Sequence, residues 1–341
     1  MNVESYKLIP FSIPFVKPFK TGKETLYYRR GIWVNIQYKN YYGWGEASPL
    51  TSFSKDSIED ADNSLKRFFK KISNSNLEIE EILSLAREVT KKSPSALFAI
   101  ETAFFDLFAQ MKNKPLAFYL NSKAIDQIKV NGLSTIHSPD DNYKVIKLKV
   151  ISSNLFVNLE KIENLSNLFG NDVCFRLDIN GGFDLTQAIR FCKEMENYNI
   201  DYIEQPIEKH ALEDLAELRN HTAIPIALDE SLIDIIDAEK IIENQSADVF
   251  IIKPMMSGGF KQSQMIMDLA KQESIRTIIT SSLETHIGLM ACMHLASANE
   301  LNEYCGLSAG YLLNQQKLSY KVKNSSIKIP SLPGLGLVDQ K

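Results

Sequence analysis

The run VIKLKV at residues 145–150 decides the fold class, because it places two lysines, Lys147 and Lys149, in an otherwise apolar β-strand. Alternate residues of a strand face the same side, so both lysines point the same way. Four more short apolar runs follow, and each ends in a charged residue: Asp178, Glu204, Asp229 and Lys253. The interval between successive charges is about the length of one strand–helix unit. This spacing predicts that the charges end successive parallel strands.

Outward from these runs, the same rhythm extends over most of the chain. Eight apolar runs alternate with helix-length amphipathic segments, at residues 128–131, 145–150, 173–178, 201–204, 224–229, 249–253, 277–281 and 303–306. Eight parallel strands close a barrel, and the catalytic residues of barrels gather where the strands end. One connection is thin, because residues 137–143 barely hold a helical turn. The first barrel helix is therefore expected to be missing.

The segment before the barrel has another pattern. Residues 1 to about 50 alternate like strands, and the pattern becomes helical from Ser57 to Met111, with Ser57–Asp60 typical of a helix start. Strands followed by helices indicate an α+β module. The tail after about Tyr311 has no barrel unit left to form.

Composition excludes several classes of function. The 341 residues carry a net charge of −4, so there is no basic footprint for nucleic acid. The most apolar stretch, Ala96–Met111, is interrupted by Glu101 and Asp106, which indicates a buried helix and no membrane span. The four cysteines form no CxxC pair, and the N-terminus lacks a signal-peptide pattern. We expect a cytoplasmic protein.

The strand-end charges suggest a particular chemistry. Three neighbouring carboxylates, Asp178, Glu204 and Asp229, would repel one another unless a hard divalent cation such as Mg²⁺ joined them. A lysine such as Lys149 becomes a useful base when burial or a nearby cation favours its neutral amine. Taken singly, each acid is better explained as a solvated strand end or a helix cap. For Lys147, a structural ion pair with one of the carboxylates is an equally good explanation.

Five motifs carry a family resemblance. They are Lys147-Leu148-Lys149, Asp178-Ile179-Asn180, Glu204-Gln205-Pro206, Asp229-Glu230-Ser231 and Lys253-Pro254. In this order they resemble the enolase superfamily, and within it the muconate-lactonizing subgroup. The resemblance implies an α/β fold, a modified TIM barrel of (β/α)₇β type at residues 121–311. An N-terminal α+β capping domain at residues 1–120, joined by the tail at 312–341, would cover it.

The resemblance also implies roles for single residues. Asp178, Glu204 and Asp229 would bind Mg²⁺, for which Mn²⁺ would substitute. Lys149 would be the principal acid/base, and Lys253 would act on the other face of a small-molecule carboxylate substrate. Residues expected next to the substrate or behind the metal ligands are Lys147, Arg176, Asn180, Glu230, Ser281, Ser282, Phe53 and Ser54.

Loops narrow the resemblance further. Residues 43–50, Phe53-Ser54 and residues 281–289 resemble the o-succinylbenzoate synthases of that subgroup. Dipeptide epimerases usually carry Asp-x-Asp after the eighth strand, where this chain reads Gly306-Leu307-Ser308-Ala309-Gly310. The resemblance therefore implies a lyase of menaquinone biosynthesis. It would catalyse Mg²⁺-dependent syn dehydration of 2-succinyl-6-hydroxy-2,4-cyclohexadiene-1-carboxylate to o-succinylbenzoate through an enediolate.

Two alternatives stay open beside the lyase. Lys149 and Lys253 on opposite walls suit a racemase of N-acylated amino acids or a dipeptide epimerase, and a non-catalytic binding protein on this scaffold is the third hypothesis. The basic stretch at residues 15–23 could be a lid over an anionic substrate or a solvated loop. The oligomeric state stays open.

Overall fold

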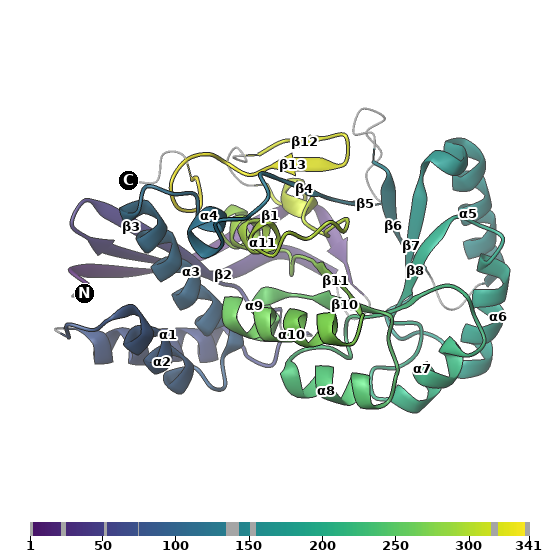
Figure 1. Cartoon of the computed structure of the whole chain (residues 1–341), viewed down its shortest axis with the longest axis horizontal. Helices are drawn as coiled ribbons and strands as arrows, with labels where there is room; N and C mark the ends of the chain where they lie inside the picture. The colour runs from purple at the N-terminus through teal and green to yellow at the C-terminus, as the bar shows by residue number, and fades with distance from the viewer. Residues whose placement is uncertain are drawn as a thin grey trace.

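The computed structural model describes residues 3–21, 25–50, 53–73, 75–133, 143–150, 155–314 and 320–337. Figure 1 shows an N-terminal module beside a larger strand–helix unit. In the module, an antiparallel sheet has the order β1-β2-β3 and lies against three helices. The elements are β1 (Ser5–Lys20), β2 (Thr25–Tyr38), β3 (Tyr41–Ala47), α1 (Ile58–Ile72), α2 (Ile79–Val89) and α3 (Pro94–Met111).

Local sequence explains these helices. The side chain of Ser57 accepts from the backbone N–H of Asp60, and the Asp60 side chain accepts from the Ser57 N–H, which completes the expected helix start. Helix α3 is buried on nearly every side. It packs closely on β3 because Gly43 and Gly45 have no side chain. A Cβ at either position would lie 2.0 Å from a carbonyl oxygen of α3.

The larger unit is built on a parallel sheet with the order β11-β10-β9-β8-β7-β6-β5. Its strands are β5 (Gly132–Leu133), β6 (Val145–Lys149), β7 (Cys174–Asp178), β8 (Ile200–Glu204), β9 (Ile226–Leu228), β10 (Val249–Ile252) and β11 (Arg276–Ile279). Single bridges pair Val130 with Cys305 and Thr280 with Gly306, so the last predicted run joins both edges of the sheet. The predicted α/β barrel architecture with an N-terminal α+β cap is confirmed.

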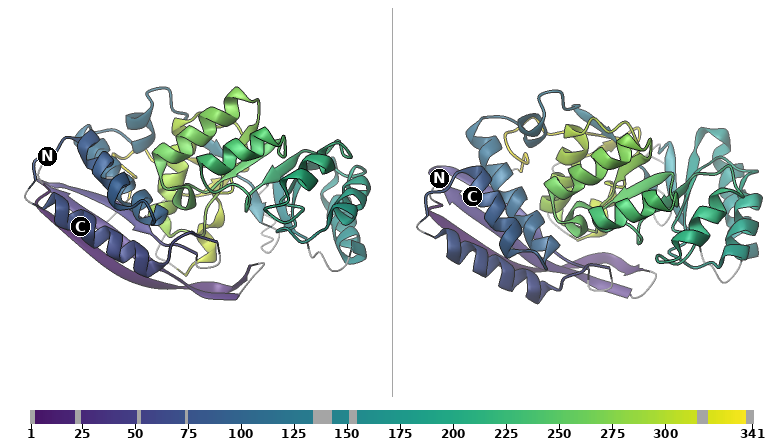
Figure 2. Two further views of the ribbon diagram at one scale, coloured as in Figure 1. Left: turned by 90° about the horizontal axis from the view of Figure 1, so that it is seen from below. Right: turned by 60° about the horizontal axis from the view of Figure 1, so that its bottom comes forward.

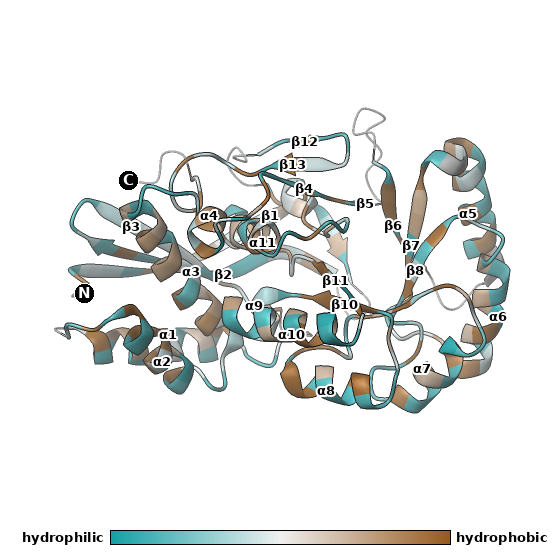
Figure 3. Cartoon of the chain, in the orientation of Figure 1, coloured by the Kyte–Doolittle hydropathy of each residue, from teal (hydrophilic) through white to brown (hydrophobic). Residues whose placement is uncertain are grey.

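Helices follow the strands in the expected alternation. They are α5 (Leu155–Phe169), α6 (Leu185–Met195), α7 (Leu212–Arg219), α8 (Ile235–Glu243), α9 (Pro254–Ser257), α10 (Phe260–Gln272) and α11 (His286–Ala298), with α4 (Leu116–Leu120) before the first strand. Figure 3 shows apolar colour along the barrel strands and mixed colour on the helices around them. Helices such as α6 and α10 therefore bury one stripe, whereas α11 is buried on nearly every side.

The first predicted barrel run differs from the structure. Residues 127–129 form β4 (Gln127–Lys129), which pairs with β13 (Ser326–Lys328) in a separate sheet with β12 (Val322–Lys323). Strand β5 begins only at Gly132, because β13 pairs with Lys129 and the two residues before it, while Val130 still forms a bridge with Cys305 of the last barrel run. Most of the thin link at residues 137–143 lies outside the described residues.

The tail returns to the N-terminal module. The backbone N–H of Leu335 donates to Oδ1 of Asp106 in α3 (2.8 Å), and Leu313 forms a bridge with Phe15 in β1. Figure 2 shows the β1–β2 hairpin reaching from the N-terminal helices towards the barrel. These contacts join the tail to the N-terminal module, while the exact division at residues 120 and 311 stays a prediction.

Two expectations from composition concern the whole chain. Among the described residues, no helix has the length and apolarity needed to span a bilayer. All four cysteines are free thiols.

Candidate active site

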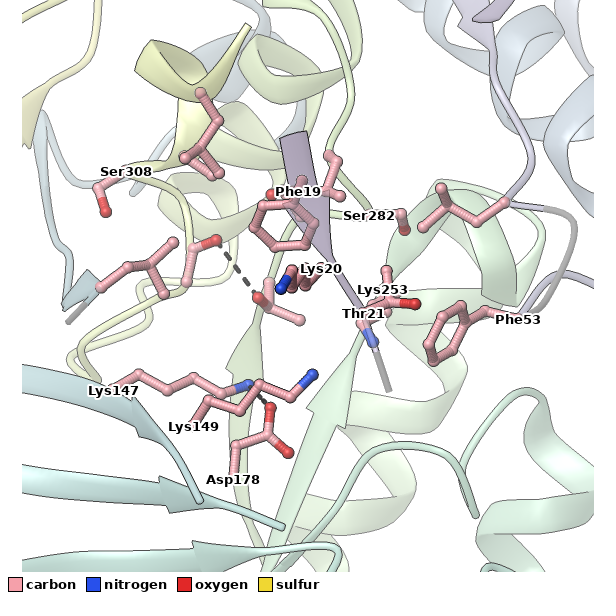
Figure 4. A pocket seen from close by; sticks show the side chains of 18 of the residues that line it. Phe19, Lys20, Thr21, Phe53, Lys147, Lys149, Asp178, Lys253, Ser282 and Ser308 are labelled. Carbon is pink, nitrogen blue, oxygen red and sulfur yellow. Dashed lines mark hydrogen bonds and ion pairs between the residues drawn. The ribbon is translucent and has the colours of Figure 1, made fainter. Parts of the chain in front are cut away.

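A cavity of about 760 Å³ lies where the barrel strands end. Its walls come from both parts of the chain (Figure 4). Barrel strands and loops contribute Lys147, Lys149, Asp178, Asn180, Asp229, Lys253, Ser281 and Ser282, and the N-terminal module contributes Val16, Lys17, Phe19, Lys20, Leu50 and Phe53. Four of the strand-end charges predicted from their spacing, Lys149, Asp178, Asp229 and Lys253, therefore line one cavity. The fifth, Glu204, is buried behind the lining and pairs with Lys147.

Strand register explains this meeting. Lys149 at the end of β6 is opposite Asp178 at the end of β7, and Asp178 is opposite Glu204 at the end of β8. Asp229 follows β9, and Lys253 follows β10. Parallel strands in register place their final side chains in one row.

Lysine ammonium groups stand between the carboxylates. Nζ of Lys147 lies 2.9 Å from Oδ2 of Asp178 and 2.7 Å from Oε1 of Glu204. Nζ of Lys253 lies 2.5 Å from Oδ2 of Asp229. Burial lowers the pKa of Lys147, but Asp178 and Glu204 outweigh it and hold that pKa well above its usual value. The ion pair considered for Lys147 is therefore present.

The carboxylates have the donor atoms that a hard cation needs. Glu204 is 1% exposed, and its Oε2 has no hydrogen-bond partner in the described part of the chain. Burial raises the pKa of this carboxyl, while Lys147 opposes the rise. Within the described ranges, no three His, Cys, Asp or Glu side chains are already gathered as a metal site, since the lysines separate them. Carboxylate oxygens with one orphaned buried atom fit Mg²⁺, which would replace a lysine as the neutralising charge.

The two proposed acid/base lysines differ in their surroundings. Partial burial lowers the pKa of Lys149, and Asp178 works against that shift. Burial also lowers the pKa of Lys253, but the opposite effect of Asp229 and Glu230 is larger. The pKa of Lys253 therefore lies above its usual value. In addition, Nζ of Lys253 lies 5.8 Å from the centroid of the Phe53 ring. The pKa of Lys149 thus lies below its usual value and that of Lys253 above it.

A layer of side chains holds the site from behind. Nδ2 of Asn180 donates to Oε1 of Glu230 at 3.1 Å, and Asn180 has a φ of 52°. Gln205, to which the sequence motifs assigned no role, accepts at Oε1 from the backbone N–H groups of Asp229 (3.2 Å) and Ser231 (3.1 Å). Because Gln205 is buried, it fixes the backbone that carries Asp229.

The residues expected beside the substrate fall into two groups. Phe53, Ser281 and Ser282 line the cavity, whereas Ser54 and Arg176 do not. Oγ of Ser54 accepts from the backbone N–H of Leu50 at 2.9 Å, so it shapes the cavity loop from outside.

Arg176 lies inside the barrel and is fully buried. Its Nε is 2.8 Å from Oδ2 of Asp201, and its guanidinium lies 4.7 Å from the Tyr202 ring centroid. Arg176 is two residues before Asp178 on β7, so both side chains are on the same face of that strand. Arg176 lies deeper in the barrel than the cavity, where it forms an ion pair with Asp201.

The chain resembles known proteins in both sequence and structure. Residues 137–339 match the family model described as enolase C-terminal domain-like, and residues 3–107 match the one described as MenC, N-terminal domain. An L-Ala-D/L-Glu epimerase of Bacillus subtilis is 27% identical, covering 96% of this chain and 94% of the relative. The solved structure of that epimerase in a substrate-liganded complex superposes with a TM-score of 0.90 at 26% identity, covering 99% of both chains.

Two other proteins show the breadth of the family. An o-succinylbenzoate synthase of Bacillus subtilis is 27% identical, covering 99% of this chain and 94% of the relative. A dipeptide epimerase from Enterococcus faecalis, complexed with Mg and the dipeptide L-Leu-L-Tyr, has a TM-score of 0.88 at 23% identity, covering 98% and 99% of the two chains.

These matches correct one expectation and establish another. The prediction of a lyase is wrong, because an epimerase matches the chain over nearly its whole length in both sequence and structure. Loop resemblance had favoured dehydration, but enzymes of one scaffold share a first step and differ in the rest. The match over residues 137–339, with the row of strand-end carboxylates, shows that the chain belongs to the enolase superfamily.

Proposed function

We propose that the protein is a Mg²⁺-dependent racemase or epimerase of N-acylated amino acids, with Lys149 and Lys253 as its two acid/base groups. One observation supports this proposal above the others. Both lysines line the same cavity, yet Lys149 ends β6 and Lys253 follows β10, with three strands between them in the sheet. Two bases that approach one carbon from opposite sides are what inversion of that carbon requires.

The lysines carry out the proton transfers. A divalent cation held by Asp178, Glu204 and Asp229 would neutralise the substrate carboxylate and so acidify the neighbouring C–H. The amine of Lys149 takes the proton from one face of that carbon, and the ammonium of Lys253 gives a proton to the other face. The carbon leaves with inverted configuration. The two lysines have then exchanged protonation states, so the same groups run the reaction in reverse.

The cavity lining favours an acylated nitrogen over a free ammonium. The only carboxylates among the described lining residues are Asp178 and Asp229, and both are paired with lysines. Lys17 and Lys20 add positive charge to the same wall. A free ammonium would find no partner there, whereas an N-acyl group carrying further negative charge would be attracted.

The relatives favour a second candidate. One of the two Bacillus subtilis relatives is an L-Ala-D/L-Glu epimerase, so a dipeptide with a free amino group is the competing substrate class. The two classes differ in the charge of one nitrogen, which makes them easy to compare in matched pairs such as L-Ala-L-Glu and N-acetyl-L-Ala-L-Glu.

The deciding experiment follows loss of the alpha proton by NMR in D₂O with Mg²⁺. Panels of N-acetyl and N-succinyl amino acids, of both hands, would be run beside free dipeptides. Wild-type protein should exchange and invert the acylated substrates. Lys149→Ala and Lys253→Ala should each stop inversion while leaving exchange for one enantiomer, opposite in the two variants. Exchange of free dipeptides alone would replace the substrate class, and no exchange by a folded, Mg²⁺-binding protein would reject the function.

A further inference from the structure

Arg29 is a buried cation on β2 that none of the family motifs contains. It is 2% exposed, although the next residue, Arg30, is exposed. It does not line the cavity. A guanidinium is costly to bury unless its donors are satisfied, so its partners indicate what it does.

Those partners are backbone carbonyls of two separate loops. Nε donates to the carbonyl of Leu283 at 2.8 Å, and Nη2 donates to that of Ser282 at 3.1 Å. Nη1 donates to the carbonyl of Pro49 at 3.2 Å, and Nη2 also donates to that of Ser48. The first pair belongs to the loop after β11, and the second to the loop after β3. Leu50, Ser282 and Leu283 from these loops line the cavity.

Glu46 ties the same two loops together from the other side. Its Oε1 accepts from Oγ of Ser48 (2.6 Å) and the backbone N–H of Thr285 (2.9 Å). Its Oε2 accepts from Oγ1 of Thr285 (2.6 Å) and the N–H of Gly288 (2.9 Å), at the start of α11. Since Oγ of Ser48 also accepts from Arg29 at 3.0 Å, these groups form one buried cluster between module and barrel.

The cluster has a consequence for the cavity. Ser282 lines the cavity, and its buried hydroxyl has no hydrogen-bond partner within the described ranges (Figure 4). Its backbone is held on both sides, because its N–H donates to Oε2 of Glu284 (2.8 Å) and its carbonyl accepts from Arg29. A held backbone with a free hydroxyl presents a donor at a fixed position.

We propose that Arg29 is a positioning residue that fixes the Ser282–Leu283 wall against the Leu50 wall and so sets which substrate the cavity accepts. The claim about substrate choice rests on the proposed function, whereas the claim about the loops does not. The hydrogen bonds of Arg29 go to neither the reacting lysines nor the three carboxylates proposed as metal ligands. Arg29 therefore acts on substrate recognition and has no part in proton transfer.

The test compares Arg29→Met, Arg29→Lys and a matched control, Glu101→Met. Glu101 is likewise buried between module and barrel, and its Oε2 accepts from the backbone N–H of Phe260 at 2.7 Å, away from the cavity. Hydrogen exchange of the full chain should show protection of the Ser282, Thr285 and Gly288 amides falling about tenfold or more in Arg29→Met. The control should leave these amides unchanged. Trp33 gives a second signal, since its Nε1 donates to Oγ1 of Thr285 at 3.0 Å.

Kinetics then test substrate choice. In Arg29→Met, KM for the preferred N-acylated substrate should rise about tenfold while kcat stays within about threefold, and Arg29→Lys should recover part of the loss. Unchanged exchange at the three amides, or an equal change in the Glu101 control, would overturn the role of Arg29 whatever the substrate proves to be. A loss confined to kcat would also overturn it. If no acylated substrate is turned over, the exchange result still decides the loop coupling, and the proposed function alone fails.

Discussion

Nζ of Lys147 lies 2.7 Å from Oε1 of Glu204, two strands away in the barrel and 1% exposed. The same Nζ lies 2.9 Å from Oδ2 of Asp178, so Lys147 occupies the position between two carboxylates that a metal cation would take. A residue that neutralises two carboxylates should control both the stability of the metal-free protein and its response to metal.

Replacing Lys147 with Met should therefore destabilise the metal-free protein by about 3–5 kcal/mol, because the buried Glu204 and the partly buried Asp178 lose their partner. Mg²⁺ should restore more stability to this variant than to the wild type. Thermal unfolding with EDTA and with Mg²⁺ measures both effects. The control is Lys149→Met, because Lys149 forms no ion pair within the described part of the chain. Equal Mg²⁺ responses in the two variants would show that Lys147 and the metal do not share the carboxylates.

Glu204→Gln should remove most of the stabilisation by divalent cations. A ligand at a hundred times its Kd stabilises a protein by about 2.7 kcal/mol. The wild type should show this gain with Mg²⁺ and with Mn²⁺, and the variant should show little of it. Calorimetric titration gives the Kd directly. Glu303→Gln is a suitable control, since Glu303 also pairs with a cation, Arg276, at the opposite end of the barrel. A variant that binds Mg²⁺ as tightly as the wild type would exclude Glu204 as a ligand.

The sequence predicts the site better than it predicts the cavity around it. Strand-end charges such as Asp178 and Glu204 are readable because parallel strands bring their final residues into one row. Arg29 is not readable, since in sequence it is one of two arginines in a strand. Only the packing of β2 against the loop after β11 shows that Arg29 is buried and Arg30 is not.

The sequence also does not predict how deep a side chain lies inside the barrel. Alternation assigns Arg176 and Asp178 to one face but gives no height along the barrel axis, which depends on partners such as Asp201. The sequence does not predict strand pairing either, where a segment distant in sequence pairs with a strand. The sequence predicts a barrel strand at residues 128–131, but Ile128 and Lys129 pair with β13 in a separate sheet.

The stability of the protein should depend on pH through Glu284. Burial raises the pKa of this carboxyl to about 7, with Glu46 raising it further and Arg29 lowering it. Its folded pKa lies above the unfolded value of about 4.3. The fold thus binds this proton more tightly, and the stabilisation is lost as pH rises from about 4.3 to about 7. Glu284→Gln should remove up to about 3 kcal/mol of this dependence. Chemical denaturation at intervals from pH 5 to pH 8 measures it. The same substitution at the exposed Glu243 should leave the profile unchanged, and a Glu284→Gln profile as steep as the wild type would exclude Glu284 as its source.

The exposed lysines of β1 should act on substrate binding alone. Lys17 and Lys20 line the cavity, and each contact with an anionic acyl group should be worth about 0.2–1 kcal/mol at an exposed position. Lys17→Ala with Lys20→Ala should raise KM about twofold to tenfold for N-succinyl substrates, much less for N-acetyl ones, and leave kcat nearly unchanged. The difference should shrink in high salt. Lys7→Ala, on the same strand but away from the cavity, is the control. An equal rise in KM for both acyl groups would count against a charge effect.

A new carboxylate should shift the substrate class towards free dipeptides. Ala309 lines the cavity in the segment Gly306–Gly310, which contains no acid, and it is 9% exposed. In Ala309→Asp, a substrate ammonium would pair with the new carboxylate, which is costly to leave buried alone. The ratio of kcat/KM for L-Ala-L-Glu to that for N-acetyl-L-Ala-L-Glu should therefore rise about tenfold, equivalent to about 1.4 kcal/mol. Ala309→Asn, which has nearly the same size without the charge, separates electrostatics from shape. If Asp and Asn shift the ratio equally, the missing carboxylate is not what excludes free dipeptides, and the preference for an acylated nitrogen must come from another wall of the cavity.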